Sequence, residues 1–465
     1  MIPEFAVLGH PNEGKSSVVS TLTEDDQIKV SPVPGETTSS RNYTVTIDGK
    51  DIIRFVDTPG FQVPRQTLGW FKAFDGDHAN IADRFIDSFK DDPFYADECE
   101  LLGPVARGAG IIYVVDGSRP VRDDDLAEME ILRLTGQPRM AIINSKTEDK
   151  DYTRDWKLEF RKHFNCIRVF NSNSANFTER IKMLESLKAI DQEWENVLSR
   201  VIMAFKKDWQ KRNQLVATLI IQSIEKSLSF SISEPITESS DQEKIKERLN
   251  KKYQNHIKDL EKKTFKQIRA LFKHHLFEYH MSAYSILKYD LFSKQTWELL
   301  GLTKEQLAAA GAIIGGTMGA FIDTAAAGIT FGLFTALGGV LGAGSALFGG
   351  KEITKKKRAG IRFGGDKLKL GPNKNLQFLY ILIDRALIYY SHIINRPHGK
   401  RDLSGQPLST DTKKKGYCAG FKASQRNVCA NFFKVVVGSS FIKEKNAGPK
   451  FEELIESVLN DISRE

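Results

Sequence analysis

Short apolar runs alternate with segments of helical spacing along the first third of the chain. Apolar-rich runs of four to seven residues, typical of buried strands, occur at 4–9, 52–56, 110–116, 140–143 and 166–171. The stretches VVSTL and FTERIKMLESL, which follow the first and last of these runs, have the spacing of amphipathic helices. The pattern predicts strands that alternate with helices over residues 1–190.

A longer helical pattern occupies the middle of the chain. Apolar residues recur at helical spacing from Trp194 to Ile224, and a second series runs from Ile245 to Leu276. The turn-like stretch SISEPITESSD separates the two series. A helix over 241–290 would be about 75 Å long. We therefore expect two long antiparallel helices, which form a helical stalk over 191–300.

The next segment is glycine-rich and almost free of charge. Residues 308–350 contain a single charged side chain, Asp323, and their glycines recur at intervals of four. A membrane hairpin of two helices needs about 40 apolar residues, and rows of glycine let such helices approach closely. A buried hairpin in a soluble protein would have a similar composition. The pattern favours a membrane hairpin over 301–360, followed by a basic, mainly helical domain over 361–465.

Charge is distributed unevenly. The chain has a net charge of +8, but residues 351–426 contain 18 basic and 5 acidic side chains. Lysines at 351 and 355–357 directly follow the glycine-rich segment, as positive residues do on the cytosolic side of an inserted helix. This excess indicates an anionic partner, either phospholipid headgroups or nucleic acid.

The cysteines and the first residues of the chain indicate the cellular compartment of the protein. The four cysteines contain no C-x-x-C pair, so they favour a reducing compartment over a disulfide framework. The chain begins with MIPEFAVLGH, which lacks the features of a signal peptide. We expect a protein that starts in the cytosol.

The most specific motif follows the first apolar run. Residues 9–16 read GHPNEGKS, which is G-x-x-x-x-G-K-[ST] with a strand before it and a helix after it. Glycines let the backbone wrap phosphates, the lysine reaches the outer phosphates, and the serine hydroxyl binds Mg²⁺. The motif predicts a nucleotide site formed by Asn12, Glu13, Gly14, Lys15, Ser16 and Ser17.

A second motif, DTPG, follows the apolar run at 52–56. Asp57 at the end of this strand is expected to bind Mg²⁺, and the N–H of Gly60 is expected to reach a terminal phosphate. The segment VPGETTSSR lies between the two motifs, and either Thr37 or Thr38 supplies a second hydroxyl to the metal. We favour Thr38, together with Ser16 and Asp57, as the metal ligands.

These residues resemble the TrmE-Era-EngA group of GTPases. The matching text is GHPNEGKSS, PGETT and DTPGF. The resemblance implies a mostly parallel, Ras-like α/β sheet, GTP with Mg²⁺, and switch loops at about 30–42 and 58–108. The whole layout resembles bacterial GTPases with an uncharacterised glycine-rich C-terminal domain.

Two residues bear on the rate of hydrolysis. Phe61 stands where a Ras-type enzyme has a glutamine that orients water, and a phenyl ring makes no hydrogen bond to that water, so intrinsic hydrolysis should be slow. In relatives with such an apolar residue, an asparagine at the position of Asn12 helps to hold K⁺. The resemblance therefore implies stimulation by K⁺ and assigns catalytic roles to Asn12, Lys15 and Thr38. The alternative for Asn12 is an ordinary turn residue.

Base recognition departs from the family pattern. The chain reads NSKTED from residue 144, whereas the family has Asn-Lys-x-Asp. Asn144 matches, and Lys146 and Asp149 are the candidates for the other two roles. Ser174 and Ala175 resemble the family's second base-binding loop, although a helix N-cap would look similar.

The segment between DTPGF and the next strand is unusually long. Residues 62–107 show a helical pattern around 79–86 and several aromatic side chains. Long ordered insertions are often functional, so the segment is either a lid or partner-reading extension, or a local packing patch.

The sequence thus predicts a membrane-associated GTPase at the cytoplasmic face of the inner membrane. Its nucleotide state is expected to act through the stalk on the glycine-rich segment, with a second copy of the chain or another protein as partner. The alternative is a GTPase of ribosome assembly or RNA modification whose basic C-terminal region binds RNA. No KH-type loop supports the nucleic-acid alternative.

Overall fold

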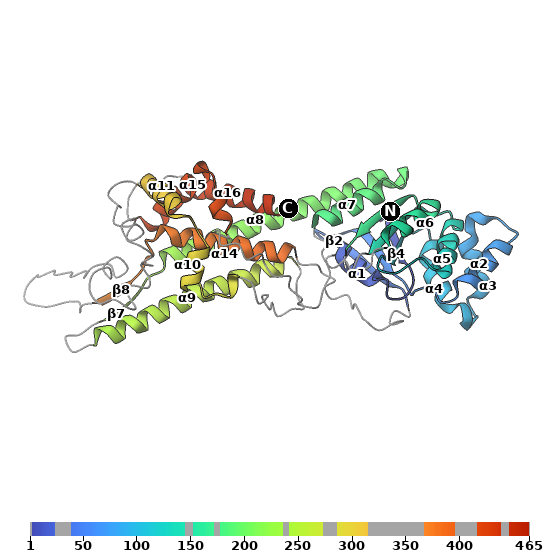
Figure 1. Ribbon diagram of the computed structural model, residues 1–465, viewed down its shortest axis with the longest axis horizontal. Helices are drawn as coiled ribbons and strands as arrows, with labels where there is room; N and C mark the ends of the chain where they lie inside the picture. Colours follow the sequence, from blue (N-terminus) through green and yellow to red (C-terminus); the bar gives the residue numbers. More distant parts are fainter. Residues whose placement is uncertain are drawn as a thin grey trace, which may run out of the picture. The chain divides into compact units, whose positions relative to one another are not determined.

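The computed structural model describes residues 2–23, 39–144, 152–171, 177–235, 241–272, 286–314, 367–395, 416–438 and 446–464. The chain forms two compact units, one made mainly of Met1–Lys211 and the other mainly of the residues from Arg212 onward (Figure 1).

The first unit is built on a six-stranded sheet. The strands lie in the order β2-β3-β1-β4-β5-β6, and all neighbours are parallel except β2 and β3. The expected Ras-like α/β sheet is therefore confirmed. The strands are β1 (Glu4–Leu8), β2 (Arg41–Ile47), β3 (Lys50–Asp57), β4 (Gly110–Asp116), β5 (Arg139–Asn144) and β6 (Cys166–Phe170).

The strand register brings the sequence motifs together. Strand β1 lies between β3 and β4, and Val7 is paired with Asp57 and with Ile112. On the next pair of strands, Asp116 is opposite Asn144. The carboxyl ends of four strands therefore meet at one edge of the sheet, where ligands of such folds bind.

Alternate residues of the strands enter two different cores. Phe5 and Val7 face a core with α1, α7 and the beginning of α8, whereas Ala6 and Leu8 face a core with α2 to α6. This period of two places apolar side chains on both faces, as a sheet covered by helices requires. The helices are α1 (Lys15–Thr23), α2 (Pro64–Ala73), α3 (Ile81–Phe89), α4 (Ala96–Ala106), α5 (Asp123–Leu134), α6 (Thr153–His163), α7 (Phe177–Lys188) and α8 (Gln192–Ser229).

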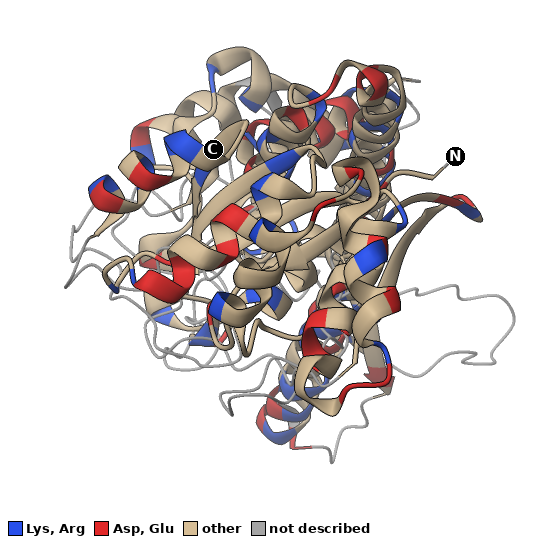
Figure 2. Cartoon of the chain, turned by 90° about the vertical axis from the view of Figure 1, so that its right-hand side faces the viewer, with Lys and Arg blue, Asp and Glu red and all other residues tan. Residues whose placement is uncertain are grey.

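The long insertion is helical, as its sequence pattern predicts. Helices α2, α3 and α4 enclose an aromatic cluster in which Trp70 and Tyr95 both contact Phe85. Residues 62–107 also contain nine acidic and five basic side chains. In the view from the end that carries α2 and α3, red acidic and blue basic positions are interspersed over the helices (Figure 2). The insertion thus has an aromatic interior and a charged exterior.

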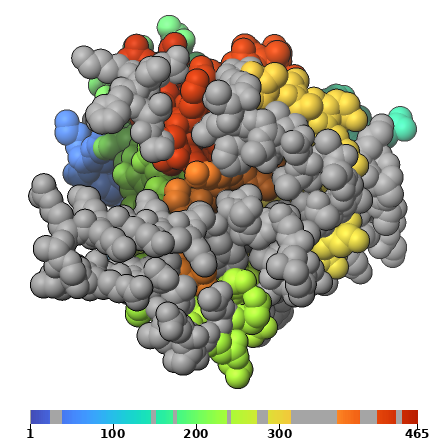
Figure 3. Space-filling model, turned by 90° about the vertical axis from the view of Figure 1, so that its left-hand side faces the viewer, coloured from blue at the N-terminus to red at the C-terminus, as the bar shows by residue number. Residues whose placement is uncertain are grey.

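The second unit is mainly helical. Helix α14 is buried along most of its length, and α15 packs against both α11 and α16. Figure 3 shows green, yellow, orange and red segments together on one face. The antiparallel strands β7 (Ile232–Pro235) and β8 (Lys367–Leu370) complete the unit. Its helices after α8 are α9 (Gln242–Leu271), α10 (Lys294–Leu299), α11 (Lys304–Ile314), α14 (Leu376–Ile394), α15 (Ala423–Val437) and α16 (Ala447–Ile462).

A buried polar group lies at the centre of α14. The carboxylate of Asp384 accepts hydrogen bonds from the N–H groups of Gly301 and Cys418, at 2.7 and 2.8 Å. Its neighbour Arg385 forms a bidentate ion pair with Glu261, at 2.5 and 2.8 Å. Two charges that interrupt an apolar run in the sequence therefore join three distant segments of this unit.

The structure differs from one of the expectations for the later part of the chain. The helix expected over 241–290 is shorter, because α9 ends at Leu271 and Ile286–Lys288 forms a separate 3₁₀ turn. The glycine-rich segment lies outside the described residues beyond 314. In the part of the chain that is described, no helix is both long and apolar enough to cross a membrane.

Candidate functional site

The loop between β1 and α1, residues 9–16, is called the phosphate loop below. Asn12 and Gly14 have positive φ angles of 68° and 97°, a conformation that asparagine and glycine tolerate. A Cβ on Gly9 would lie 2.3 Å from the carbonyl oxygen of Val114, so only glycine fits there. The local sequence thus produces a tight loop with helix α1 starting at Lys15.

Lys15 is buried under this loop. Its Nζ donates hydrogen bonds to the carbonyl oxygens of Gly9 and His10, at 3.0 and 3.1 Å. Burial lowers the pKa of this ammonium, and the nearby carboxylate of Asp57 opposes the shift. The loop carbonyls therefore hold the ammonium against the phosphate loop.

Ser16 and Asp57 form a hydroxyl and carboxylate pair. Ser16 Oγ donates to Asp57 Oδ2 at 2.7 Å, and Asp57 is 2% exposed. The other oxygen, Oδ1, is buried and has no hydrogen-bond partner among the described residues. Burial raises the pKa of this carboxyl. Oxygen ligands of this kind suit Mg²⁺, and a cation would satisfy the unpaired oxygen, so the residues present fit the metal.

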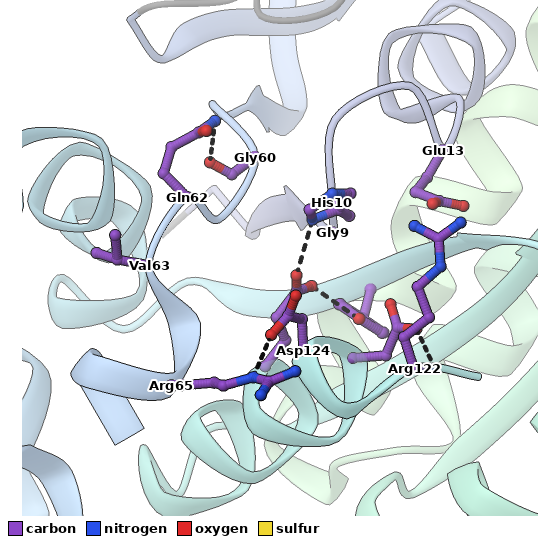
Figure 4. Close-up of polar contacts among 12 residues, drawn as sticks. Gly9, His10, Glu13, Gly60, Gln62, Val63, Arg65, Arg122 and Asp124 are labelled. Atoms are coloured by element: carbon purple, nitrogen blue, oxygen red, sulfur yellow. Dashed lines mark hydrogen bonds and ion pairs between the residues drawn. The ribbon is translucent and has the colours of Figure 1, made fainter. Parts of the chain in front are cut away.

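The DTPG loop packs directly on the phosphate loop. Thr58 Oγ1 donates to the carbonyl oxygen of Val7 at 2.8 Å, which ties the loop to β1. A Cβ on Gly60 would lie 2.4 Å from Cδ of Pro11, so a side chain there would collide with the phosphate loop. Figure 4 shows Gly60 and Gln62 on one loop and His10 and Gly9 on the facing loop. Gly60 is thus held directly against the phosphate loop.

Phe61 does not extend toward solvent at this loop. Its side chain is fully buried in the core under α2 to α6. The exposed residue is Gln62, whose Nε2 donates to the carbonyl oxygen of Gly60 at 3.4 Å. A glutamine two residues after DTPG is visible in the sequence, but no motif assigns it a role.

A buried ion-pair network holds Glu13 of the phosphate loop. Glu13 accepts hydrogen bonds from Arg119 Nε at 2.6 Å and from the N–H of Asp116. Arg119 also forms a bidentate pair with Asp125, with both bonds at 2.7 Å. The side chain of Glu13 is therefore engaged by the protein. Sequence spacing did not reveal this network, because Glu13 and Arg119 are 106 residues apart.

A second network starts at His10. The Nδ1 atom of His10 lies 3.2 Å from Oε1 of Glu128, and the hydroxyl of Tyr113 donates to Glu128 Oε2 at 2.8 Å. Burial raises the pKa of Glu128, and the hydrogen bond to Glu128 raises the pKa of His10. Helix α5 therefore holds two side chains of the phosphate loop, His10 through Glu128 and Glu13 through Asp125 and Arg119.

One of the predicted base-site residues lies in the described part of the chain. Asn144 is fully buried, and its Nδ2 donates to the carbonyl oxygen of Glu13 at 3.1 Å. This bond connects the end of β5 with the phosphate loop. The other predicted base-site residues lie outside the described residues, namely Lys146, Asp149, Ser174 and Ala175. The two candidate threonine ligands, Thr37 and Thr38, also lie outside them.

Two family models match the chain. Residues 159–459 match a domain of unknown function (DUF3482), and residues 4–145 match a family described as 50S ribosome-binding GTPase. The first match covers more than half of the chain, and the second covers the strands and loops that form the site.

Curated relatives match the N-terminal part. GTPase Der of Pseudothermotoga lettingae is 27% identical over 210 residues, which cover 43% of this chain and 41% of that protein. The tRNA modification GTPase MnmE of Petrotoga mobilis is 23% identical over 232 residues, which cover 49% of this chain and 44% of that protein. The chain thus spans less than half the length of these relatives.

Two solved structures of Era also match part of the chain. A crystal structure of Era in complex with MgGDPNP and a piece of 16S ribosomal RNA is 18% identical, with a TM-score of 0.30. That alignment covers 41% of this chain and 57% of Era. An Aquifex aeolicus Era variant bound to GDP·AlF4⁻ is 15% identical, with a TM-score of 0.29, over 51% of this chain and 72% of that one.

Proposed function

We propose a function from the premise that the chain belongs to the DUF3482 family and carries an N-terminal P-loop GTPase domain of the Era, Der and MnmE type. The protein is a Mg²⁺-dependent GTPase in this proposal, and its nucleotide state controls its C-terminal half. The observation that carries the catalytic part is the pair of Ser16 and Asp57 beside buried Lys15, in which one carboxylate oxygen has no partner among the described residues.

The residues of the site have separate roles in this proposal. Lys15 exchanges its loop carbonyls for phosphate oxygens, and the N–H groups at the start of α1 bind the same phosphates. Ser16 and Asp57 hold Mg²⁺, which when bound neutralises phosphate charge. The N–H of Gly60 donates to the terminal phosphate and so distinguishes GTP from GDP. Thr38 is the proposed second hydroxyl ligand.

Hydrolysis is proposed to be slow and stimulated by K⁺. Phe61 is buried and offers no hydrogen bond to an attacking water. Asn12 lies at the turn of the phosphate loop with a φ angle of 68° and is the proposed K⁺ ligand. Equal rates of the full chain in K⁺ and Na⁺ would refute this role, and Asn12→Ala should abolish any difference between the two salts.

The first experiment is nucleotide binding by the full chain with Mg²⁺. We expect GTP and GDP to bind, ATP to compete poorly, and Lys15→Ala to weaken GTP binding by at least about tenfold, because a charge-assisted contact to phosphate is lost. Lys50→Ala is the matched control, since Lys50 is exposed on β3. Undiminished binding and hydrolysis by Lys15→Ala would contradict the proposal.

Membrane association is the proposed output of the switch. Its support is the apolar composition of residues 308–350 and the lysines that follow them. The site of action would be the cytoplasmic face of the inner membrane, with another copy of the chain as a possible assembly partner. Retention of the full chain on membranes after a carbonate wash, and release of a chain without residues 308–350, would support this output.

Ribosome assembly or RNA modification is the second candidate function. It is favoured by the match to a 50S ribosome-binding GTPase family and by the excess of 13 positive charges in residues 351–426. If both chains in the carbonate experiment are released, this candidate predicts salt-sensitive binding of the full chain to ribosomal particles.

A further inference from the structure

Helix α4 of the insertion contacts two loops that border the nucleotide site. One is the chain that directly follows the DTPG loop, and the other is Ser40, just before β2. Both contacts come from one turn of α4, at Glu98 and Glu100. This arrangement bears on whether the insertion is functional or only a packing patch.

Glu98 makes the stronger contact. Its Oε1 accepts hydrogen bonds from the N–H groups of Gln62 and Val63, both at 2.7 Å. The residue is fully buried, and its Oε2 has no hydrogen-bond partner among the described residues. A buried carboxylate is costly for stability unless it is paired and hydrogen-bonded, and here only one of the two oxygens has partners among the described residues. Apolar packing accounts for the rest of the helix, but it does not account for this group.

The two N–H groups lie next to Gly60, the residue proposed to donate to the terminal phosphate. Gly60 precedes Gln62 by two positions and packs against Pro11 so closely that a Cβ would lie 2.4 Å from it. Phe61 between them is buried in the core. With Phe61 anchored and Gln62 held by Glu98, the N–H of Gly60 is kept beside the phosphate loop.

Glu100 makes a second, exposed contact. Its carboxylate accepts a hydrogen bond from the N–H of Ser40 at 2.8 Å, and Ser40 Oγ donates to the carbonyl oxygen of Glu100 at 3.2 Å. Ser40 follows the PGETTS segment that contains the candidate threonine ligands. The same helical turn is therefore bonded to Ser40, which follows the candidate threonines in the sequence.

Helix α4 is itself firmly anchored. Leu101, Leu102 and Val105 are buried in the core that also contains Phe61. The turn before α4 begins with Pro93, and Tyr95 packs on Phe85 of the aromatic cluster. A displacement of either bonded loop would therefore have to break its bonds to α4 or move the helix within its core.

We propose that α4 is a positioning element for the terminal phosphate, in which Glu98 holds Gly60 within reach of the γ-phosphate and Glu100 ties the segment before β2 to the same helix. GTPase switch loops are ordered by contacts to the γ-phosphate and released after hydrolysis. The hydrogen bonds of Glu98 and Glu100 should therefore make the chain bind GTP more tightly than GDP. A ligand is coupled to a conformation only if its affinity differs between the two conformations. This inference rests on the proposed GTPase function and names a positioning role, not a catalytic one.

The test compares affinities of the full chain for GDP and for a non-hydrolysable GTP analogue, both with Mg²⁺. Glu98→Ala should weaken analogue binding about tenfold more than GDP binding, the scale of losing charge-assisted hydrogen bonds. Glu98→Gln keeps an acceptor oxygen and should retain most of the preference for the analogue. Asp87→Asn is the matched control, because it removes an exposed carboxylate from α3 of the same insertion.

Glu100→Ala extends the test without disturbing the core, since Glu100 is exposed. This variant should reduce the preference for the GTP analogue over GDP by about threefold, as expected for an exposed hydrogen bond. It also keeps the inference testable if Glu98→Ala does not fold. An equal loss of both affinities, or an unchanged preference in the folded variants, overturns the inference. If the unmodified chain binds neither nucleotide, the proposed function fails before the role of α4 is reached.

Discussion

Glu13 places a negative charge in the loop that is proposed to receive phosphates. Its carboxylate is only 4% exposed and is paired with Arg119, which is in turn paired with Asp125. An unpaired carboxylate at this place would repel an anionic ligand. Arg119 therefore offsets the charge of Glu13 and also fixes the shape of the loop, so one cation has two functions at the residue scale.

Removal of Arg119 should expose this repulsion. We expect Arg119→Ala to weaken GTP and GDP binding by more than about tenfold, because loss of one partner leaves a buried charge uncompensated. The double variant with Glu13→Gln should recover part of the lost affinity, since it removes the carboxylate nearest the ligand while Asp125 still lacks its cation. Titration calorimetry of the unmodified chain, the Arg119→Ala and Glu13→Gln single variants and the double variant measures the coupling. Arg133→Ala is the control, since Arg133 is exposed on α5.

The insertion shows how one element combines packing with a costly polar group. Its helices enclose an aromatic cluster, and the expected helix near 79–86 is confirmed by α3. The sequence left open whether the insertion is a lid or a packing patch. Bonds from Glu98 and Glu100 to both bordering loops favour a positioning role, since neither carboxylate is needed to fill the aromatic core.

The pH dependence of stability provides a test at the element scale. Burial raises the pKa of Glu98 above its usual value of 4.5, so the folded chain holds this proton more tightly than the unfolded chain. This contribution to stability is fully present below about pH 4.5 and is lost as the pH rises through the raised pKa. Relative to Glu98→Gln, which does not titrate, the unmodified chain should lose stability with rising pH.

The slope of that difference can be at most about 1.4 kcal/mol per pH unit, the value for one proton. Denaturant unfolding of both proteins between pH 4 and 7, without nucleotide, measures it, with Asp87→Asn as the control. A difference that is constant over this range would show that Glu98 titrates normally.

The whole chain consists of two units that differ in how they use buried charge. In the first, charged side chains surround the phosphate loop, whereas in the second Asp384 and Arg385 join distant segments within a helical core. A Cβ on Gly416 would lie 1.9 Å from Asp384 Oδ2, so the backbone closes tightly around this carboxylate. The group supports the structure of the second unit, and no ligand is needed to explain it.

Substitution of Asp384 should therefore affect one unit. We expect Asp384→Ala to lower the free energy of unfolding of the second unit by about 2–4 kcal/mol, because two buried N–H groups lose their acceptor. Nucleotide affinity should change by less than about twofold if the units fold separately. Differential scanning calorimetry with a nucleotide titration measures both quantities, and Asp461→Ala is the exposed control on α16. A large loss of nucleotide affinity would show that the units depend on each other.

The sequence by itself determined the phosphate loop, the DTPG loop and the alternation of strands and helices in the first unit. These features follow from neighbouring residues, since glycine positions, a lysine and strand-ending carboxylates act through the local backbone. Only the tertiary structure decided which side chains meet: Glu13 with Arg119, His10 with Glu128, and Gln62 with Glu98. These partners lie 106, 118 and 36 residues apart, and they meet because a parallel sheet gathers the carboxyl ends of its strands at one edge, where the helices that cover it supply the partners.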